Sequence, residues 1–211
     1  MSDRRSAIKG LYVVTDTVIQ NRFTHEELAG QAARGGARVM QLRDKKPGSG
    51  TLFDTAARFV EVCREAGAIS IINDRADIAL ASGADGVHLG LNDLPVDIAR
   101  EVLGPDKIIG GTASTIEEAL RVEQLGADYV GFGHIFETPT KKKEYAPRGT
   151  GYLKKLCEAV SIPVVAIGGI DAGNIRQVVD AGADAVAVCR AVCAAENPES
   201  AARSLQEAFR T

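Results

Sequence analysis

The stretch Gly182-Ala183-Asp184-Ala185-Val186 has three close relatives in the same chain: Gly36-Ala37-Arg38-Val39-Met40, Gly83-Ala84-Asp85-Gly86-Val87 and Gly126-Ala127-Asp128-Tyr129-Val130. Glycine accepts the positive φ that ends many helices, so each copy predicts a helix C-terminus followed by a buried strand. The copies begin 47, 43 and 56 residues apart. A βαβ unit takes about 30 residues or more, so each interval holds two β/α units and the chain holds eight.

Eight short runs rich in valine and isoleucine fit this count. They predict strands at residues 11–15, 39–43, 69–73, 86–89, 108–111, 129–133, 164–167 and 185–189. Near-continuous apolar runs are typical of parallel strands covered on both faces. Amphipathic segments, for example 24–34, 52–66, 115–125 and 198–209, predict the helices between and after them. The sequence therefore predicts an α/β protein, a single (β/α)8 TIM barrel over residues 1–211.

Length and composition exclude several other classes. The 211 residues suffice for a minimal barrel and leave no room for a second domain. The formal net charge of −3 gives no reason to expect a nucleic-acid partner, and no run is long enough for a membrane helix. The N-terminus is polar, so no secretory signal is expected. The four cysteines form no C-x-x-C pair, which predicts buried, reduced thiols in a cytoplasmic protein. The sequence is also compatible with a homo-oligomer.

Polar residues or glycines follow seven of the predicted strands, and TIM-barrel chemistry lies at the carboxyl ends of the strands. Gln41, Arg43 and Lys45 alternate along the second strand end, so their side chains share one face. Two cations and an amide suit a polyanion such as diphosphate. A solvated, salt-bridged strand end, helped by Asp44, is an equal alternative.

Asp74 and Asp93 follow two neighbouring strands, so their carboxylates are expected to approach one another at the barrel mouth. Two carboxylates together with substrate phosphate oxygens form the usual Mg²⁺ site. Taken singly, Asp74 as a helix cap and Asp93 as an exposed turn residue are the commoner cases. Their occurrence together beside a cationic strand end favours the metal.

Two further strand ends suit phosphate. Gly168-Gly169 precedes a helix, where backbone N–H groups can hold a phosphate, although a Gly-Gly pair can also serve only a tight turn. The loop after the sixth strand contains Thr138, Pro139, Thr140 and Lys141, a set that can close over phosphates as a lid, while Lys142 and Lys143 are expected to be solvated. His88 either fills the barrel interior or contacts the diphosphate.

Taken in order, these motifs resemble the thiamine-phosphate synthase family over residues 11–193. The motifs are Gln41-Leu42-Arg43-Asp44-Lys45, Ile72-Asn73-Asp74-Arg75, Gly86-Val87-His88-Leu89-Gly90 with Asp93, Thr138-Pro139-Thr140-Lys141 and Ile167-Gly168-Gly169-Ile170. The resemblance implies transfer of the hydroxymethylpyrimidine group from its diphosphate to thiazole phosphate, with release of diphosphate. The protein then supplies no nucleophile, because the pyrimidine amino group stabilises the cation left behind and the thiazole nitrogen captures it.

The same resemblance implies a role for each matching residue. The pyrimidine diphosphate would contact Gln41, Leu42, Arg43, Asp44, Lys45, Asn73, Thr112 and Lys141. Thiazole phosphate would contact Thr138, Pro139, Thr140, Gly169, Cys189 and Arg190. Asp74 and Asp93 would bind Mg²⁺, while Arg43, Lys45 and Lys141 would offset the charge of the departing diphosphate.

Some positions depart from the synthase pattern. His134 and Glu137 occupy positions where synthases more often have prolines. This sequence pattern is closer to that of the sister family, the thiazole tautomerases. The tautomerase histidine, however, would fall at Ser114, and tautomerases tend to lack the cationic cluster and the metal aspartates found here. A tautomerase and a non-catalytic thiazole-phosphate-binding barrel are therefore the alternatives, and whether His134 and Glu137 add tautomerase-like activity is left open.

Overall fold

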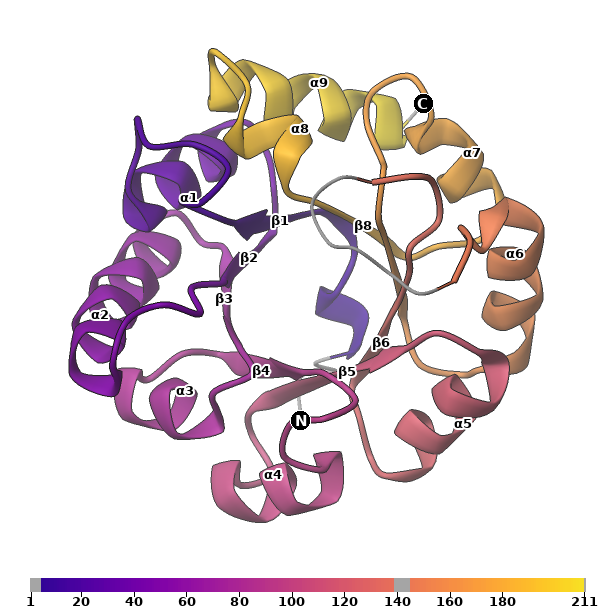
Figure 1. The fold of residues 1–211 in the computed structure, drawn as a ribbon, viewed down its shortest axis with the longest axis horizontal. Coiled ribbons are helices and arrows are strands. Elements are labelled where there is room, and N and C mark those ends of the chain that lie inside the picture. The colour runs from indigo at the N-terminus through magenta and orange to yellow at the C-terminus, as the bar shows by residue number, and fades with distance from the viewer. Residues whose placement is uncertain (1–4, 139–144, 211) are drawn as a thin grey trace.

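The fold is a closed ring of eight parallel strands in chain order, β1 through β8, with β8 paired to β1. The computed structural model describes residues 5–138 and 145–210. Helices surround the ring, as Figure 1 shows, and the predicted single (β/α)8 barrel is confirmed. The strands are β1 (Gly10–Thr15), β2 (Val39–Leu42), β3 (Ile69–Asn73), β4 (Gly86–Leu89), β5 (Ile108–Ala113), β6 (Tyr129–Gly133), β7 (Val164–Ile167) and β8 (Ala185–Val188).

One main helix follows each of the first seven strands, and two follow β8. Thr24 and Glu27 form a full capping box at the first turn of α1, which fixes where that helix begins. A short 3₁₀ helix, η1 (Arg5–Ala7), precedes β1. The α-helices are α1 (His25–Arg34), α2 (Ser49–Glu65), α3 (Ala76–Ser82), α4 (Val96–Leu103), α5 (Ile116–Gln124), α6 (Gly149–Ala159), α7 (Ile175–Asp180), α8 (Arg190–Cys193) and α9 (Pro198–Arg210).

The repeated Gly-Ala steps lie between a helix end and a strand, with glycine at positive φ, as the sequence predicted. Gly36, Gly83, Gly126 and Gly182 have φ angles of +96°, +73°, +90° and +99°. Each lies between the end of a helix and the start of the next strand. The repeat therefore marks the turns at the amino ends of β2, β4, β6 and β8, which leaves the opposite strand ends free for function.

Several boundaries differ from those predicted. β2 ends at Leu42 and β8 at Val188, one residue short of Arg43 and Cys189, because these two residues already belong to the loops above the barrel. β5 runs two residues further, to Ala113, and α2 begins at Ser49 instead of residue 52. These shifts are confined to element ends, where hydrogen-bonding patterns fray.

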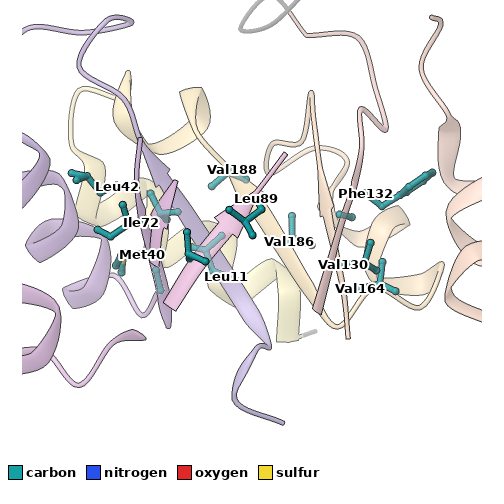
Figure 2. Packing of buried hydrophobic residues seen from close by; sticks show 14 of the residues in the cluster. Leu11, Met40, Leu42, Ile72, Leu89, Val130, Phe132, Val164, Val186 and Val188 are labelled. Carbon is teal, nitrogen blue, oxygen red and sulfur yellow. The ribbon is translucent and has the colours of Figure 1, made fainter. Parts of the chain in front are cut away.

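Alternating strand residues divide the core into two layers. Met40, Leu42 and Ile72 lie on the side of the strands that faces the helices, as Figure 2 shows. The inner layer of the barrel includes Tyr12 and Tyr129, together with Val14, Val39, Ile71, Ile108 and Val165. Ile8, just before β1, packs with this inner layer, so the N-terminal segment fills the amino end of the barrel. Open space is thus left toward the carboxyl ends of the strands.

The four cysteines are free thiols, as predicted. Cys63 and Cys193 are buried as predicted, whereas Cys157 and Cys189 are partly exposed, so the prediction of burial is wrong for these two. Over the described part of the chain, no helix combines the length and the apolar character needed to cross a membrane.

Candidate active site

A cavity of about 590 Å³ opens at the carboxyl ends of the strands. Its wall brings together eleven of the residues singled out from the sequence, drawn from seven of the eight strand ends. They are Gln41, Arg43, Lys45, Asn73, Asp74, Asp93, Thr112, Thr138, Gly169, Cys189 and Arg190. The geometry therefore unites residues that lie up to 149 positions apart in the chain, as expected for a barrel site.

Two of the singled-out residues lie off the cavity wall. Leu42 is buried in the layer between strands and helices. The Asp44 carboxylate lies 3.6 Å from His25 Nε2, on the α1 side of the strand end. Leu42 points outward because it alternates with Gln41 along β2, whereas Asp44 lies in the loop beyond the strand. Pro139, Thr140, Lys141, Lys142 and Lys143 lie outside the described residues.

Arg43 is held by a carboxylate that the sequence reading missed. Asp16 follows β1 and is buried, and its Oδ2 accepts a hydrogen bond from Arg43 Nη1 at 2.8 Å. The other carboxylate oxygen of Asp16 accepts from the Val18 N–H at 2.7 Å. The Arg43 guanidinium is thus fixed in place and still reaches the cavity, where most of its donors can serve a ligand. The position of Asp16, directly after a predicted strand, is the sequence feature that could have identified it.

Lys45, Asp74 and Asp93 form a charged cluster on the adjoining wall. Lys45 Nζ lies 2.7 Å from Asp74 Oδ2, and the Asp74 and Asp93 carboxylates share a hydrogen bond. Partial burial tends to raise the pKa of Asp74, but the Lys45 ammonium and the hydrogen bond to Asp93 lower it below its usual range. Burial and the neighbouring Asp74 raise the pKa of Asp93. Two like charges in close contact push their pKa values apart in this way.

The backbone holds both carboxylates firmly. Asp74 is the one non-glycine residue with positive φ, +66°, over the described ranges 5–138 and 145–210. Its N–H donates to the His88 carbonyl at 2.8 Å, which ties the strand end to β4. Asp93 Oδ2 accepts from the Gly90 N–H at 2.7 Å. A left-handed backbone costs a non-glycine residue free energy, and such strain persists where the surroundings fix it, often at functional sites.

This pair of carboxylates fits a magnesium ion that also binds a phosphorylated ligand. Mg²⁺ is usually held by one or two carboxylates, with substrate oxygens and water completing the octahedron. No cluster of three or more His, Cys, Asp or Glu side chains suited to a metal occurs in the described part of the chain. An all-protein cage is therefore not available there, and the Lys45 ammonium already occupies the position of a cation beside Asp74.

The floor of the cavity is a hydrogen-bonded chain of side chains that crosses the barrel. Gln41 Nε2 donates to Tyr12 Oη at 2.7 Å, and Tyr12 Oη lies 3.0 Å from Tyr129 Oη. Tyr129 Oη lies 3.1 Å from His88 Nδ1, and His88 Nε2 lies 2.9 Å from Thr112 Oγ1. Burial raises the pKa of both tyrosines, so they remain phenols. His88 thus both fills the interior and lines the cavity.

Across the cavity, a glycine turn follows β7. Gly168 and Gly169 have φ angles of +105° and +68°. A Cβ on Gly168 would lie 2.4 Å from His134 Cβ, and one on Gly169 would lie 2.4 Å from the Glu137 carbonyl oxygen. Asn174 Nδ2 donates to the Gly169 carbonyl at 2.9 Å. Only glycine allows the turn to pack this closely against the segment after β6.

Cys189 and Arg190 complete the wall next to this turn. Cys189 lines the cavity, and a hydrogen bond with Cys193 together with burial raises the pKa of its thiol. It therefore remains protonated and offers a neutral contact. Arg190 is exposed at the rim. The cavity as a whole combines a charged wall formed by Arg43, Lys45, Asp74 and Asp93, a hydrogen-bonded floor and a glycine-lined wall. This combination suits a ligand pair in which one member carries diphosphate.

Comparisons with known proteins agree on one family. The family model described as thiamine monophosphate synthase matches residues 11–192. Thiamine-phosphate synthase of Chlorobium luteolum is 50% identical over 185 residues, 88% of this chain and 87% of its own. That of Methanocella arvoryzae is 49% identical over 93% of this chain and 92% of its own. The solved thiamine phosphate pyrophosphorylase from Pyrococcus furiosus superposes with a TM-score of 0.89 at 38% identity, covering 98% of this chain and 97% of its own.

Proposed function

This chain belongs to the thiamine monophosphate synthase family, and on that premise we propose that it joins hydroxymethylpyrimidine diphosphate to thiazole phosphate. The products are thiamine phosphate and diphosphate. The observation that carries the proposal is the cluster of Lys45, Asp74 and Asp93 beside the anchored Arg43, since it offers both cations and metal-binding oxygens to one diphosphate.

In this proposal the charged wall receives the diphosphate. Arg43 and Lys45 donate charge-assisted hydrogen bonds to its oxygens, and Asp16 keeps the Arg43 fork in position. Lys45 must leave or share its contact with Asp74 when it does so. Asp74 and Asp93 would hold Mg²⁺, which when bound supplies charge neutralisation to the diphosphate. Lys141, from outside the described residues, would add a further cation.

The pyrimidine ring then lies over the hydrogen-bonded floor of the cavity. Gln41, Asn73 and Thr112 line this part of the cavity and can hydrogen-bond the ring and its amino group. Because Gln41 and Thr112 stand at the two ends of the chain through Tyr12, Tyr129 and His88, their orientations are fixed before the substrate arrives. Preorganised polar groups of this kind support catalysis because they need not reorient during the reaction.

The chemistry requires positioning rather than a protein nucleophile. The C–O bond to the diphosphate breaks, its electron pair leaves with the diphosphate, and the pyrimidine amino group stabilises the methylene cation. The thiazole nitrogen then supplies the electron pair of the new C–N bond. Arg43 and Lys45 stabilise the charge on the departing group, and the cavity walls hold the two partners within reach.

Thiazole phosphate occupies the glycine-lined side. Thr138, Gly169, Cys189 and Arg190 line it, and Pro139 and Thr140 are assigned to it from the family pattern alone. Close backbone packing at Gly168 and Gly169 suits a phosphate approached by main-chain groups. Neither alternative, tautomerase or non-catalytic binder, is favoured: every curated relative above bears the synthase name, and neither activity needs the charged wall.

The proposal is tested by incubating the protein with both substrates and Mg²⁺ and separating the products by chromatography. Thiamine phosphate should accumulate, and it should be lost when either substrate or the metal is withheld. Formation of a rearranged thiazole phosphate without coupling would favour the tautomerase instead.

A further inference from the structure

His134 is a buried polar side chain for which neither the fold nor the proposed roles account. It follows directly after β6, is 7% exposed and lies on the cavity wall. Its Nδ1 atom is buried and has no hydrogen-bond partner within residues 5–138 and 145–210. A buried polar atom left unpaired lowers stability and calls for an explanation.

The imidazole packs beside an aromatic ring, and this contact gives Nδ1 no hydrogen-bond partner among the described residues. Its ring centroid lies 5.4 Å from that of Tyr145. Tyr145 is itself anchored, because its hydroxyl lies 2.7 Å from Ser114 Oγ and donates to the Gly133 carbonyl at 3.0 Å. The Arg148 guanidinium covers the Tyr145 ring at 4.3 Å. These contacts hold Tyr145 in place beside His134, and none of them involves a nitrogen of the imidazole.

The position of His134 decides which ligand it can meet. Its Cβ lies where a Cβ on Gly168 would clash, at 2.4 Å, so the imidazole stands next to the glycine turn after β7. The charged wall of Lys45 and Asp74 belongs to other strands, β2 and β3, whereas β6 pairs with β7. A group that reaches His134 therefore belongs to the molecule seated against the glycine turn.

We propose that His134 hydrogen-bonds thiazole phosphate and determines the affinity of the site for this acceptor. The inference rests on the proposed function for the identity of the acceptor. Rotation about the Cβ–Cγ bond of histidine is soft and roughly two-fold, so the imidazole nitrogen can turn to a phosphate oxygen at the cavity wall. An imidazole N–H donating to that oxygen satisfies the ring and adds a contact that an apolar side chain cannot make.

Two substitutions separate this role from packing. His134→Leu keeps a comparable apolar volume but removes both nitrogens, and His134→Asn places an amide nitrogen near the position of Nδ1. Isothermal titration calorimetry with thiazole phosphate, in the presence of Mg²⁺ and inorganic diphosphate, measures acceptor affinity without turnover. We expect His134→Leu to weaken binding by about tenfold or more and His134→Asn to recover most of the loss.

The same variants should show a split in their kinetic constants. In His134→Leu, the KM for thiazole phosphate should rise in parallel with the loss of affinity, while the KM for the pyrimidine diphosphate stays within about twofold. The melting temperature of His134→Leu should not fall, because the substitution breaks no hydrogen bond found among residues 5–138 and 145–210 and removes a buried nitrogen that is unpaired there. A residue that serves only packing would not produce rescue by asparagine.

Equal affinity for thiazole phosphate in all three proteins would overturn the inference, as would an undetectable affinity in the unaltered protein. A loss in His134→Leu that asparagine does not restore would also overturn it. If binding depends on His134 as expected but no thiamine phosphate forms, the proposed reaction fails and the assignment of His134 holds.

Discussion

The ammonium nitrogen of Lys45 lies 2.7 Å from a carboxylate oxygen of Asp74. The contact joins the end of β2 to the end of β3, and it places a cation where a diphosphate and a metal ion would meet. Asp74 in turn shares a hydrogen bond with Asp93. In the absence of ligand, Lys45 and Arg43 are therefore each already paired with a carboxylate, and binding of a diphosphate must redistribute these contacts.

Replacing Lys45 tests the cationic part of this wall. Lys45→Met should lower kcat/KM by about 10²- to 10³-fold, the range found when one group that stabilises developing negative charge is removed. Lys46→Met is the matched control, because Lys46 is exposed and does not line the cavity. Steady-state kinetics of both variants should show the loss for Lys45 alone. A similar loss for Lys46 would mean that the strand end acts only as a diffuse positive field.

Replacing the carboxylates tests the metal assignment. Asp74→Asn and Asp93→Asn keep the side-chain volume, and asparagine tolerates the left-handed backbone of residue 74. Each should raise the Mg²⁺ concentration for half-maximal activity by at least about tenfold, the lower end of the effects seen around metal sites. The measurement is a magnesium titration of the initial rate. An unchanged midpoint in both variants would remove these residues from the metal site.

The tyrosine pair in the cavity floor predicts a non-additive effect on stability. Tyr12→Phe and Tyr129→Phe each break the same 3.0 Å contact and should each lower the free energy of unfolding by about 1–3 kcal/mol. The double variant should lose clearly less than the sum, since residues in one hydrogen-bonded network couple. Denaturant titration of the four proteins gives the coupling energy. Simple additivity would contradict the shared contact.

Alanine substitutions at two glycines, one packed against the cavity floor and one exposed on a helix, should change stability in opposite directions. A Cβ on Gly110 would lie 2.0 Å from Tyr129 Cζ, whereas one on Gly151, exposed in α6, would meet nothing within 4 Å. Gly110→Ala should destabilise the protein by about 1–3 kcal/mol or more through overpacking. Gly151→Ala should stabilise it by about 0.5–1 kcal/mol, as expected in a helix. Denaturant midpoints with unchanged slopes measure both, and the reverse order would contradict the packing.

His25 predicts a pH dependence of stability. Burial lowers its pKa below the usual 6.5, against the raising effect of the nearby Asp44. The Thr15 hydroxyl donates to the Gln41 carbonyl, so it accepts from His25 Nδ1, 2.7 Å away. The folded state thus binds fewer protons at His25 than the unfolded chain does. Its contribution to stability is complete above pH 6.5 and falls as the pH drops below that value toward the lowered pKa.

His25→Gln should flatten this part of the profile. The free energy of unfolding, measured between about pH 5 and pH 7, should depend less on pH in the variant than in the unaltered protein. An identical slope in the two proteins would show that His25 is not the group responsible.

The sequence was sufficient for the architecture because its signals are local. Positive φ at four glycines and apolar runs between them follow from single-residue sterics, and all four angles agree with the prediction. Strand alternation likewise put Gln41, Arg43 and Lys45 on one face, and all three line the cavity. These inferences needed no knowledge of which strand ends meet which.

The parts that sequence reasoning missed depend on contacts across the barrel. Tyr12 and Tyr129 read as apolar strand residues, and only closure of the barrel brings their hydroxyls together. The role of Asp16 follows only from its ion pair with Arg43. That of His134 follows only from its buried Nδ1 atom, which has no hydrogen-bond partner in the part of the chain that the structure describes. The family pattern, carried over as a continuous run, also included Leu42 and Asp44. Leu42 lies in the layer between strands and helices because it alternates with Gln41 on β2, and the Asp44 carboxylate lies beside His25.

The central claim is that one cavity couples two substrates with loss of diphosphate. The most direct measurement is the stoichiometry of a single turnover, with enzyme in excess over hydroxymethylpyrimidine diphosphate and with thiazole phosphate and Mg²⁺ present. We predict one diphosphate released for each thiamine phosphate formed, and neither product from an Asp74→Asn, Asp93→Asn double variant that remains folded. Diphosphate release without thiamine phosphate, or full activity in the double variant, would contradict the account.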